Sequence, residues 1–455
     1  MRIIVVGAGK VGTSLTAQLI REHRVTVIDQ EPKLIENIIN VYDVMGVCGN
    51  GASYEVQKEA EVGKADLLIA TTSSDEINIL ACLVAKKLGV AHTIARIRNP
   101  EYETQLRFMR GELGLTMSIN PEKAAAHEIA RVLRFPAAMK LESFSKGRLE
   151  LVEYRLPERS ALDGVRLLDI YRNARARVLI CAVSRKGQTT IPSGDFELKT
   201  GDKIYVTAAP DHLSAFFQYL GVFRKKASTV MIVGASKMCY YLASELLEMG
   251  MSVKIIDQNE QRCVEMSEKL PRALVIVGDG TDSELLSEEG ISQTDAFVAI
   301  TGLDEANILM ALSAAKQSGD CCKVVAKINR KSLLELVSTE SLIDSVVSTG
   351  AVTTELILQY IRAMKNASAS KVKTLHRIVD EKVEALEFSV TPDISFAGVP
   401  LRDLNLKRGL LLAGIVRQNG QIVIPSGNDV LHLHDDVIVV TTDTQLEDLR
   451  DILAE

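Results

Sequence analysis

The chain has 455 residues, which is too many for a single core, and its 47% hydrophobic and 25% charged residues are typical of a soluble globular protein with several domains. Its net charge of −6, without a cluster of Lys and Arg, argues against nucleic acid as a partner, because binding phosphates requires clustered positive charge. No apolar run approaches the roughly 20 residues of a membrane-spanning helix, and the first residues predict a strand instead of a secretory signal.

Strands and helices alternate from residue 2 to residue 135. Apolar, β-branched runs predict strands within 2–9, 24–30, 42–51, 65–75 and 92–100. Helices are predicted between them, from the first glycines to about Ile20, at Lys33–Ile39 and at Ile77–Leu88, and another at Pro121–Phe135. Near-continuous apolar strands separated by helices are typical of a parallel sheet covered on both faces, so we expect an α/β, Rossmann-like lobe.

The segment that follows has a different pattern. Residues 177–208 alternate between polar and apolar side chains and contain Lys-Gly, Ser-Gly-Asp and Thr-Gly-Asp turns. Alternation with a period of two, interrupted by such turns, is the pattern of β-hairpins. We therefore expect a small, β-rich α+β lobe after the Rossmann-like lobe.

The whole pattern then occurs a second time. Gly234 follows Gly7 by 227 residues, and "TIPSG" at 190–194 returns 233 residues later as "VIPSG" at 423–427. Landmarks in constant order with a slowly growing offset indicate a tandem duplication. The sequence thus predicts four lobes, joined in part by a polar linker at 365–374. Their expected bounds are 1–123 (first N-lobe), 143–226 (first C-lobe), 228–350 (second N-lobe) and 371–453 (second C-lobe).

The first N-lobe begins with a nucleotide-binding pattern. Gly7, Gly9 and Gly12 form G-x-G-x-x-G between a predicted strand and a predicted helix, which suits a tight turn, a close approach to a pyrophosphate, and close packing of helix on sheet. Asp29 ends the second strand, where a carboxylate can accept both ribose hydroxyls and would repel a 2′-phosphate. We expect the phosphates at the helix N-terminus. ATP, ADP, AMP and NAD(H) all satisfy this pattern, and a relict lobe used only for assembly is the alternative.

Further candidate residues fall at the carboxyl ends of later strands, where ligands bind in open α/β sheets. They are Gly49, Asn50, Gly51, Thr71, Thr72, Ser73, Arg96 and Arg98. The guanidinium of Arg98 could reach a phosphate by bidentate contact, or it could form a surface ion pair. Lys10 lies inside the turn and either contacts phosphate or is solvated.

The second copy of the pattern is altered. Ser236 replaces Gly9, Cys239 replaces Gly12, Asn329 replaces Arg98 and Lys327 replaces Arg96. Because a serine Cβ crowds the pyrophosphate position and one cation is lost, the second N-lobe is predicted to keep the adenosine half of the site and to bind phosphates weakly or not at all. The candidate residues of this second site are Gly234, Lys237, Asp257, Asp279 and Thr301.

Several motifs together resemble a known family. "GAGKVG", "VID", "GNG", "ATTSSDE" and "ARIR", followed by a β-rich lobe and then by the whole set again, resemble the RCK (or KTN) family, whose members regulate K⁺ conductance. Within it, the chain is most similar to the peripheral cytosolic subunits of bacterial and archaeal Trk potassium uptake systems. The likeness covers essentially the full chain, and "ATTSSDE" with the duplication is its specific part.

The resemblance implies a fold and a function. It implies two RCK N-lobe and C-lobe pairs per chain, and a homotetramer whose ring of N-lobes lies on the inner face of the membrane beneath an integral potassium channel subunit of the TrkH/TrkG type. It also implies that NAD(H), ATP or ADP binds the N-lobes and gates potassium uptake by changing the shape of the ring. The first-site ligands implied here are Gly7, Ala8, Gly9, Lys10, Val11, Asp29, Thr72, Ser73 and Arg98.

Two other classes of function were weighed. A nicotinamide-dependent oxidoreductase needs an acid, a base or a carbonyl-polarising group, and the seven histidines form no Ser-His-Asp, Cys-His or His-Glu-x-x-His pattern. His432 and His434 lie two residues apart and weakly suggest a metal, and the seven cysteines contain no Cys-x-x-Cys pair. A structural adaptor with vestigial sites is the second alternative. We predict neither catalytic residues nor metal ligands.

Overall fold

The computed structural model describes all of residues 1–455 except 100–101, 103–113, 135–139, 159, 175, 222–226, 319–321, 338–342, 367–371, 380–381, 444–445, 447 and 455. Contacts divide the chain into two compact units. One unit contains Met1–Ala130 and Ser228–Leu356, and the other contains Arg131–Ala227 and Ile357–Glu455. Each unit therefore combines corresponding segments of the two copies. Part of the predicted linker at 365–374 lies outside the described residues, and the lobe bounds stay a prediction.

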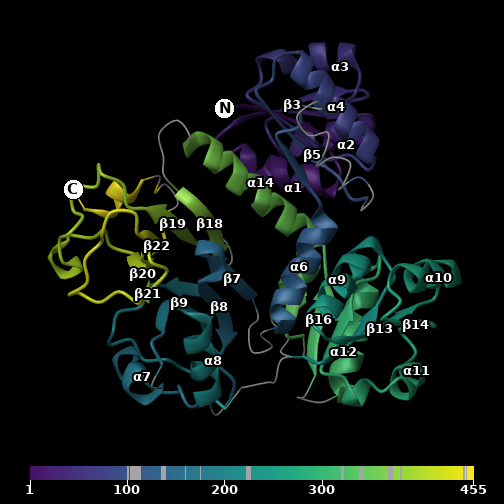
Figure 1. Cartoon of the computed structure of the whole chain (residues 1–455). Coiled ribbons are helices and arrows are strands. Elements are labelled where there is room, and N and C mark those ends of the chain that lie inside the picture. The colour runs from purple at the N-terminus through teal and green to yellow at the C-terminus, as the bar shows by residue number, and fades with distance from the viewer. Residues whose placement is uncertain are drawn as a thin grey trace. The chain divides into compact units, whose positions relative to one another are not determined.

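The first unit begins with a six-stranded parallel sheet of order β3-β2-β1-β4-β5-β6. Figure 1 labels its strands β3 and β5 and the neighbouring helices α1, α2, α3 and α4. Its strands are β1 (Arg2–Val6), β2 (Arg24–Asp29), β3 (Met45–Cys48), β4 (Leu67–Ala70), β5 (His92–Arg96) and β6 (Met117–Ile119). Its helices are α1 (Lys10–Leu19), α2 (Pro32–Val41), α3 (Tyr54–Glu59), α4 (Asp75–Lys87) and α6 (Pro121–Arg134). The order reverses between β1 and β4, and this reversal is where an open α/β sheet binds ligands.

The second copy repeats this sheet in the order β14-β13-β12-β15-β16-β17. Its strands are β12 (Thr229–Val233), β13 (Ser252–Asp257), β14 (Leu274–Val277), β15 (Ala296–Ala299), β16 (Lys323–Lys327) and β17 (Ser345–Val347). Its helices are α9 (Lys237–Glu248), α10 (Glu260–Lys269), α11 (Ser283–Glu288), α12 (Asp304–Ser318), α13 (Lys331–Val337) and α14 (Thr349–Asn366). Central strands such as β4 and β15 are buried along their whole length, which explains their uninterrupted apolar sequences.

The second unit contains two five-stranded antiparallel sheets, of order β10-β9-β11-β8-β7 and β18-β19-β22-β20-β21. The first consists of β7 (Lys140–Phe144), β8 (Leu149–Arg155), β9 (Leu179–Arg185), β10 (Gln188–Thr190) and β11 (Lys203–Ala208), with helices α7 (Leu167–Ala174) and α8 (Pro210–Tyr219). The second consists of β18 (Val372–Ile378), β19 (Val383–Ser389), β20 (Leu410–Val416), β21 (Ile422–Val423) and β22 (Asp436–Thr441). Both copies thus contain the predicted β-rich lobe. α-Helices accompany the first lobe, whereas the described part of the second lobe has the short 3-10 helices Leu401–Asp403 and Leu449–Ile452 instead.

The two antiparallel sheets share one buried core, in which β20 contacts β9 and β11. The first sheet contributes Phe144, Leu149, Leu151 and Tyr205, and the second contributes Ile378, Val383, Ala385 and Val440, among others. Each sheet also has a core of its own on the opposite face. Both faces of each sheet are therefore covered, as in a sandwich with outer helices or loops.

The predicted helices agree with the structure within a few residues, whereas the short outer strands β6 and β17 were not predicted. Each has only three residues, too few for a periodic pattern. Within the described ranges, no helix is both long and apolar enough to cross a membrane.

Candidate functional site

The turn between β1 and α1 is the centre of the first candidate site, which comprises residues 7–12 and Asp29. Gly7 has a φ of +103°, a conformation that residues with side chains rarely adopt. A Cβ atom added to Gly12 would lie 1.7 Å from the carbonyl oxygen of Gly7. The chain can therefore pass this tightly from strand to helix only because both positions lack a side chain.

Gly9 leaves the N-terminus of α1 open. A Cβ atom added there would meet no heavy atom within 4 Å. Gly9 is the N-cap residue, and no side chain in the described ranges caps the helix. The first N–H groups and the positive end of the helix dipole therefore remain available for an anion, with the exposed Lys10 beside them. Ala8 and Val11 bury their side chains, so only their backbone N–H groups could serve a ligand.

Asp29 ends β2 beside this turn. Its Oδ2 accepts a hydrogen bond from the Ala8 N–H at 2.6 Å, and its Oδ1 accepts one from the Glu31 N–H at 2.9 Å. The carboxylate is thereby oriented by the backbone on both sides. Because each carboxylate oxygen can accept a second hydrogen bond, the group still offers positions for ribose hydroxyls.

The Gly49–Asn50–Gly51 turn after β3 has an explanation in packing. A Cβ atom at Gly51 would lie 2.1 Å from Cγ1 of Val6, and one at Gly49 would lie 2.7 Å from Cγ2 of Val56. The Oδ1 of Asn50 accepts a hydrogen bond from the N–H two residues later at 3.0 Å, which stabilises the turn. Gly51 therefore lets the turn pack against β1, and Gly49 lets it pack against α3.

Thr72 follows β4 but does not extend its hydroxyl as a free ligand. Its N–H and its Oγ1 both donate to Oδ1 of Asn78, at 2.8 and 2.7 Å. The amide of Asn78, which is fully buried, donates in turn to the Arg96 carbonyl at 2.8 Å. Asn78 therefore ties the loop after β4 to the end of β5, and Ser73 is exposed beside it.

Arg98 is bound within its own lobe. Its guanidinium donates to the carbonyl oxygen of Ser73 and lies 3.6 Å from Oδ1 of Asp75. The Oδ2 of Asp75 also accepts the backbone N–H groups of Arg98 and Asn99, at 2.9 and 2.8 Å. A ligand phosphate would compete with these contacts for the guanidinium.

Asp75 and Asn78 were not predicted as site residues, yet they organise this edge of the sheet. A signal was present, because the same Asp-x-x-Asn spacing recurs as Asp304 and Asn307 in the second copy. There Asn307 makes the equivalent bonds to Thr301 and to the carbonyl of residue 327. Thr301 is thus the counterpart of Thr72 and has the same structural partner.

The second candidate site comprises residues 234–239 and Asp257, and its helix is capped. Gly234 keeps a φ of +111°, and Oδ2 of Asp257 accepts the Ala235 N–H at 2.6 Å, as in the first copy. Ser236, however, is the N-cap of α9, and its Oγ accepts the Cys239 N–H at 3.3 Å. The serine hydroxyl thus occupies a donor that Gly9 leaves open in the first copy.

The remaining second-site residues show the same divergence. Asp279 holds its own turn, because its Oδ1 accepts from the N–H and the hydroxyl of Thr281. The N–H of Asn329 donates to Asp304 at 3.0 Å, as the N–H of Arg98 does to Asp75, but its side chain carries no charge. Lys237 begins α9 and is exposed, like Lys10 in the first copy.

The two N-lobes contact each other through helices. Nδ2 of Asn120, just before α6, donates to the Tyr241 hydroxyl of α9 at 2.8 Å, and Nδ1 of His127 in α6 lies 2.9 Å from Oε1 of Glu245 in α9. Reciprocally, the hydroxyl of Thr354 in α14 lies 3.5 Å from that of Ser14 in α1. Each helix that carries a glycine turn is therefore contacted by a helix of the other copy.

Buried charges accompany these contacts. Burial lowers the pKa of Arg96, although Glu122, whose Oε1 lies 3.6 Å from the guanidinium, raises it again. Burial likewise lowers the pKa of Lys327, the equivalent residue of the second copy, while Asp304 and Glu122 oppose the shift. Glu76, by contrast, is exposed, and its pKa falls to about 2, chiefly because its carboxylate accepts hydrogen bonds from Ser74 and Tyr102.

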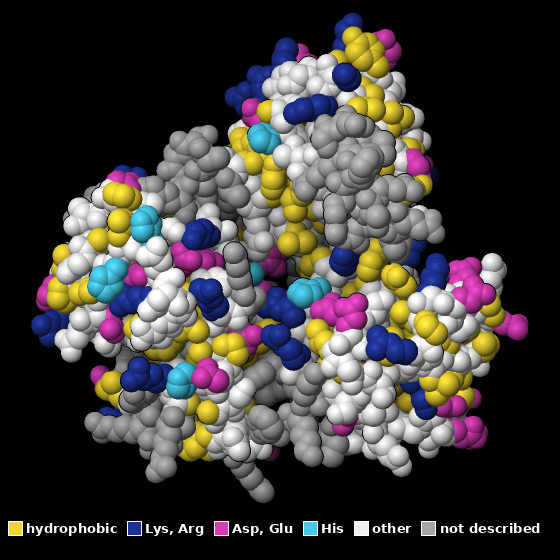
Figure 2. All heavy atoms as spheres, viewed as in Figure 1, with side chains coloured by type: hydrophobic (Ala, Val, Ile, Leu, Met, Phe, Trp, Pro, Cys, Tyr) yellow, Lys and Arg dark blue, Asp and Glu magenta, His cyan; other side chains and the backbone are white. Residues whose placement is uncertain are grey.

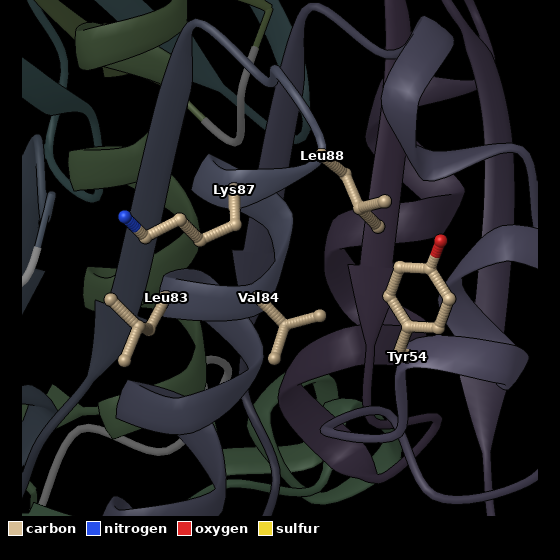
Figure 3. A pocket seen from close by; sticks show the side chains of 5 residues that line it. All are labelled: Tyr54, Leu83, Val84, Lys87 and Leu88. Carbon is tan, nitrogen blue, oxygen red and sulfur yellow. The ribbon is translucent and has the colours of Figure 1, made fainter.

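An apolar hollow of about 280 Å³ lies elsewhere on the first N-lobe, between α3 and α4 (Figure 3). It is lined by Tyr54, Leu83, Val84, Lys87 and Leu88. None of the candidate site residues lines this hollow. On the face drawn in Figure 2, acidic and basic side chains are interspersed, without an extended basic area.

His432, weighed above as a metal ligand, has other partners. Its Nδ1 lies 2.7 Å from the guanidinium of Arg417, which also pairs with Asp435. A metal ion could bind Nδ1 of His432 only by displacing the Arg417 guanidinium from His432 and Asp435. His434 is exposed and has a φ of +67°.

Comparison with known proteins identifies the family. The TrkA-N domain model matches residues 3–121 and 230–349, and the TrkA-C domain model matches residues 151–221 and 385–454. The Trk system potassium uptake protein TrkA homolog of Archaeoglobus fulgidus is 30% identical over 99% of this chain and 100% of its own length. The Trk system potassium uptake protein TrkA of Vibrio alginolyticus is 31% identical over 97% of this chain and 94% of its own.

Solved structures share the fold. The GsuK channel bound to NAD has a TM-score of 0.62 and 19% identity, over 98% of this chain and 77% of that one. The GsuK RCK domain alone has the same TM-score and identity, over 98% and 93%. The duplicated parallel and antiparallel sheets are therefore those of RCK domains. By its matched domains and its full-length relatives, the chain belongs to the TrkA family of Trk system potassium uptake proteins.

Proposed function

We propose that this chain is the nucleotide-binding regulatory subunit of a Trk-type potassium uptake system, and that a nucleotide at the first candidate site controls potassium flux through a membrane subunit of the TrkH/TrkG type. The relatives that extend over the whole chain are named for potassium uptake. The observation that carries the nucleotide assignment is the open N-terminus of α1 at Gly9, beside the carboxylate of Asp29.

The proposed ligand set follows from this geometry. Backbone N–H groups at residues 8–12 and the side chain of Lys10 hold the phosphates, Asp29 accepts the adenosine ribose, and Arg98 exchanges Ser73 and Asp75 for a phosphate. NAD(H), ATP and ADP share the required adenosine diphosphate. Likeness to GsuK structures bound to NAD and to ADP supports these ligands. The Gly49–Gly51 turn and Thr72 support the site indirectly, through their contacts with Val6, Val56 and Asn78.

The second candidate site has a smaller part in this proposal. The Ser236 hydroxyl already binds an N–H group of α9, and Asn329 supplies no charge, so phosphates are held weakly there. Asp257 keeps the ribose-binding geometry of Asp29. The second site therefore takes the adenosine half of a nucleotide at most.

The contacts between the N-lobes support a route from ligand to gating. Phosphates bound at α1 act on the helix that contacts Thr354 of α14, and α6 couples the first copy to α9 of the second. A nucleotide shifts the equilibrium between two arrangements only by its difference in affinity for them, and coupling of about 1–3 kcal/mol is typical. A homotetrameric ring on the inner face of the membrane would transmit the change to the membrane subunit.

Exchanging the N-cap residues between the copies tests the proposal. Gly9→Ser should abolish or greatly weaken nucleotide binding measured by calorimetry, because its hydroxyl caps α1, while the open space around Gly9 preserves folding. Ser236→Gly is the matched variant and should leave first-site affinity unchanged. The proposal fails if Gly9→Ser binds NAD, ATP and ADP as tightly as the parent. It also fails if potassium flux into proteoliposomes that contain the membrane subunit and this chain is the same with and without nucleotide.

Equilibrium dialysis followed by product analysis separates the alternatives. A regulator binds labelled nucleotide without consuming it. An oxidoreductase would consume NAD(H) in the presence of a small substrate, and an adaptor would retain no nucleotide.

A further inference from the structure

Glu142 and His376 hold the same place in the two C-lobes. Glu142 lies on β7 opposite Leu151 of β8, and His376 lies on β18 opposite Ala385 of β19. Leu151 and Ala385 are both the third residue of their strands, which are equivalent in the two sheets. The duplication has therefore produced a glutamate in one C-lobe and a histidine at the corresponding position of the other.

These two equivalent residues contact each other. Nδ1 of His376 lies 2.9 Å from Oε2 of Glu142, and their side chains are only 11% and 8% exposed. Equivalent positions of two similar lobes can meet in this way only at the approximate two-fold axis that relates the lobes. The rings of His376 and Phe144 also pack perpendicular to each other, with centroids 5.0 Å apart.

A second polar contact between the C-lobes is also asymmetric. Glu387 of β19, which is 3% exposed, accepts hydrogen bonds from the hydroxyl and the N–H of Ser145, at 2.8 and 3.3 Å. The counterpart of Ser145 is Val379, because both residues follow the equivalent strands β7 and β18 and both have positive φ, +49° and +55°. A valine has no hydroxyl to offer to a buried carboxylate.

We propose that the Glu142–His376 pair, assisted by Glu387 and Ser145, makes a first C-lobe select a second C-lobe and reject a copy of itself. Two first C-lobes would bring Glu142 against Glu142 in a buried place, where like charges strongly disfavour each other. Two second C-lobes would bring His376 against His376 and would leave Glu387 facing Val379. Only the unlike combination pairs Glu142 with His376 and at the same time gives Glu387 the hydroxyl of Ser145.

This selection matters because the two C-lobes share a fold and an apolar interface. The shared core is apolar throughout and contains aliphatic side chains as well as the rings of Phe144 and Tyr205. Apolar packing tolerates exchanges between side chains of similar volume far better than a buried site tolerates an unpaired charge. In a homo-oligomer, C-lobes of neighbouring chains would compete for the same surface. Buried polar pairs are the device by which proteins fix one partner among similar ones.

A charge exchange in the full-length protein tests the inference. His376→Glu places two carboxylates at the axis and Glu142→His places two imidazoles there, whereas the exchange variant with both substitutions restores the pair in reverse. At pH 8 we expect each single variant to lower the apparent unfolding midpoint by about 4 °C and to give mixed species in size-exclusion chromatography with light scattering. The exchange variant should recover most of the midpoint and the single species.

Two controls keep the outcome decisive. Glu158→His makes the same chemical change as Glu142→His at an exposed position of the first C-lobe and should alter neither measurement. His376→Gln keeps a hydrogen-bond donor and adds no second negative charge, so it should lower the apparent unfolding midpoint less than His376→Glu does. Where a single variant does not fold, recovery of folding in the exchange variant supports the inference. The inference is overturned if the single variants have the same unfolding midpoint and the same single species as the parent. It is also overturned if the exchange variant recovers neither the midpoint nor the single species.

Discussion

The carboxylate of Asp29 and the N–H of Ala8 are joined by a hydrogen bond of 2.6 Å, and Asp257 and Ala235 repeat it at the same length in the second copy. The bond ties the end of one strand to the glycine turn without any ligand. The acidic residue at this position therefore supports the turn, in addition to the ribose-binding role that we propose for Asp29.

Asp29→Asn should weaken nucleotide binding at least tenfold and destabilise the protein by about 1 kcal/mol. The amide has one acceptor oxygen in place of two, so it cannot serve both Ala8 and Glu31, and it binds ribose hydroxyls less well. Calorimetry with NAD and thermal unfolding would measure the two effects. Asp257→Asn is the matched variant, expected to lose stability similarly but to keep first-site affinity; an equal loss of affinity in both variants would contradict the assignment.

Asn78→Ala should destabilise the protein by about 2–3 kcal/mol, because it removes a fully buried amide and leaves the partly buried Thr72 N–H and Arg96 carbonyl without their partner. Denaturant unfolding followed by circular dichroism would give the change. Asn50→Ala, which removes only an exposed turn contact, is the control and should cost well under half as much. Similar costs for the two variants would show that Asn78 is not the clamp described above.

Gly51→Ala should destabilise the protein by about 1–3 kcal/mol through overpacking, because its Cβ would lie 2.1 Å from Cγ1 of Val6. Nucleotide affinity of the folded protein should stay within about twofold of the parent, since Gly51 acts by packing. Gly302→Ala, whose Cβ would meet nothing within 4 Å, is the control. A selective loss of affinity without loss of stability would restore Gly51 as a ligand-contacting residue.

Glu150→Gln should make the protein less sensitive to rising pH. Burial raises the pKa of Glu150 above its ordinary value of 4.5, although Arg134 and Arg131 oppose the shift. An acid with a raised pKa in the folded state contributes stability that is complete below pH 4.5 and is lost as the pH rises through the folded pKa. Glutamine removes this loss while still accepting the hydrogen bond from Arg134.

Unfolding midpoints of the parent and of Glu150→Gln, measured between pH 4 and pH 8, would check this. The midpoint of the variant relative to the parent should rise across that range. Glu158→Gln, at an exposed position of the same C-lobe, should show a constant difference. A relative midpoint of Glu150→Gln that falls with pH would mean that the charged carboxylate is favoured in the fold.

The local parts of the site could be predicted because short-range rules govern them. Gly7, Gly9, Gly12 and Asp29 occupy the turn and the strand end expected from their spacing, since a strand, a glycine turn and a helix impose their geometry within a few residues. The packing roles of Gly49 and Gly51 and the hydrogen-bonding role of Thr72 could not be predicted from the sequence. Their neighbours Val56, Val6 and Asn78 are brought to them by the packing of the lobe.

The sequence by itself determined the duplication, the two fold classes and the difference between the first and second glycine turns, because periodicity and glycine sterics act along the chain. Only the tertiary structure decided that Ser236 caps its own helix and that the Arg98 guanidinium binds Ser73 and Asp75. It also decided that His376 meets Glu142, which lies 234 residues earlier. Contacts between distant residues depend on how whole sheets and helices bury their apolar faces together, and no local pattern encodes that arrangement.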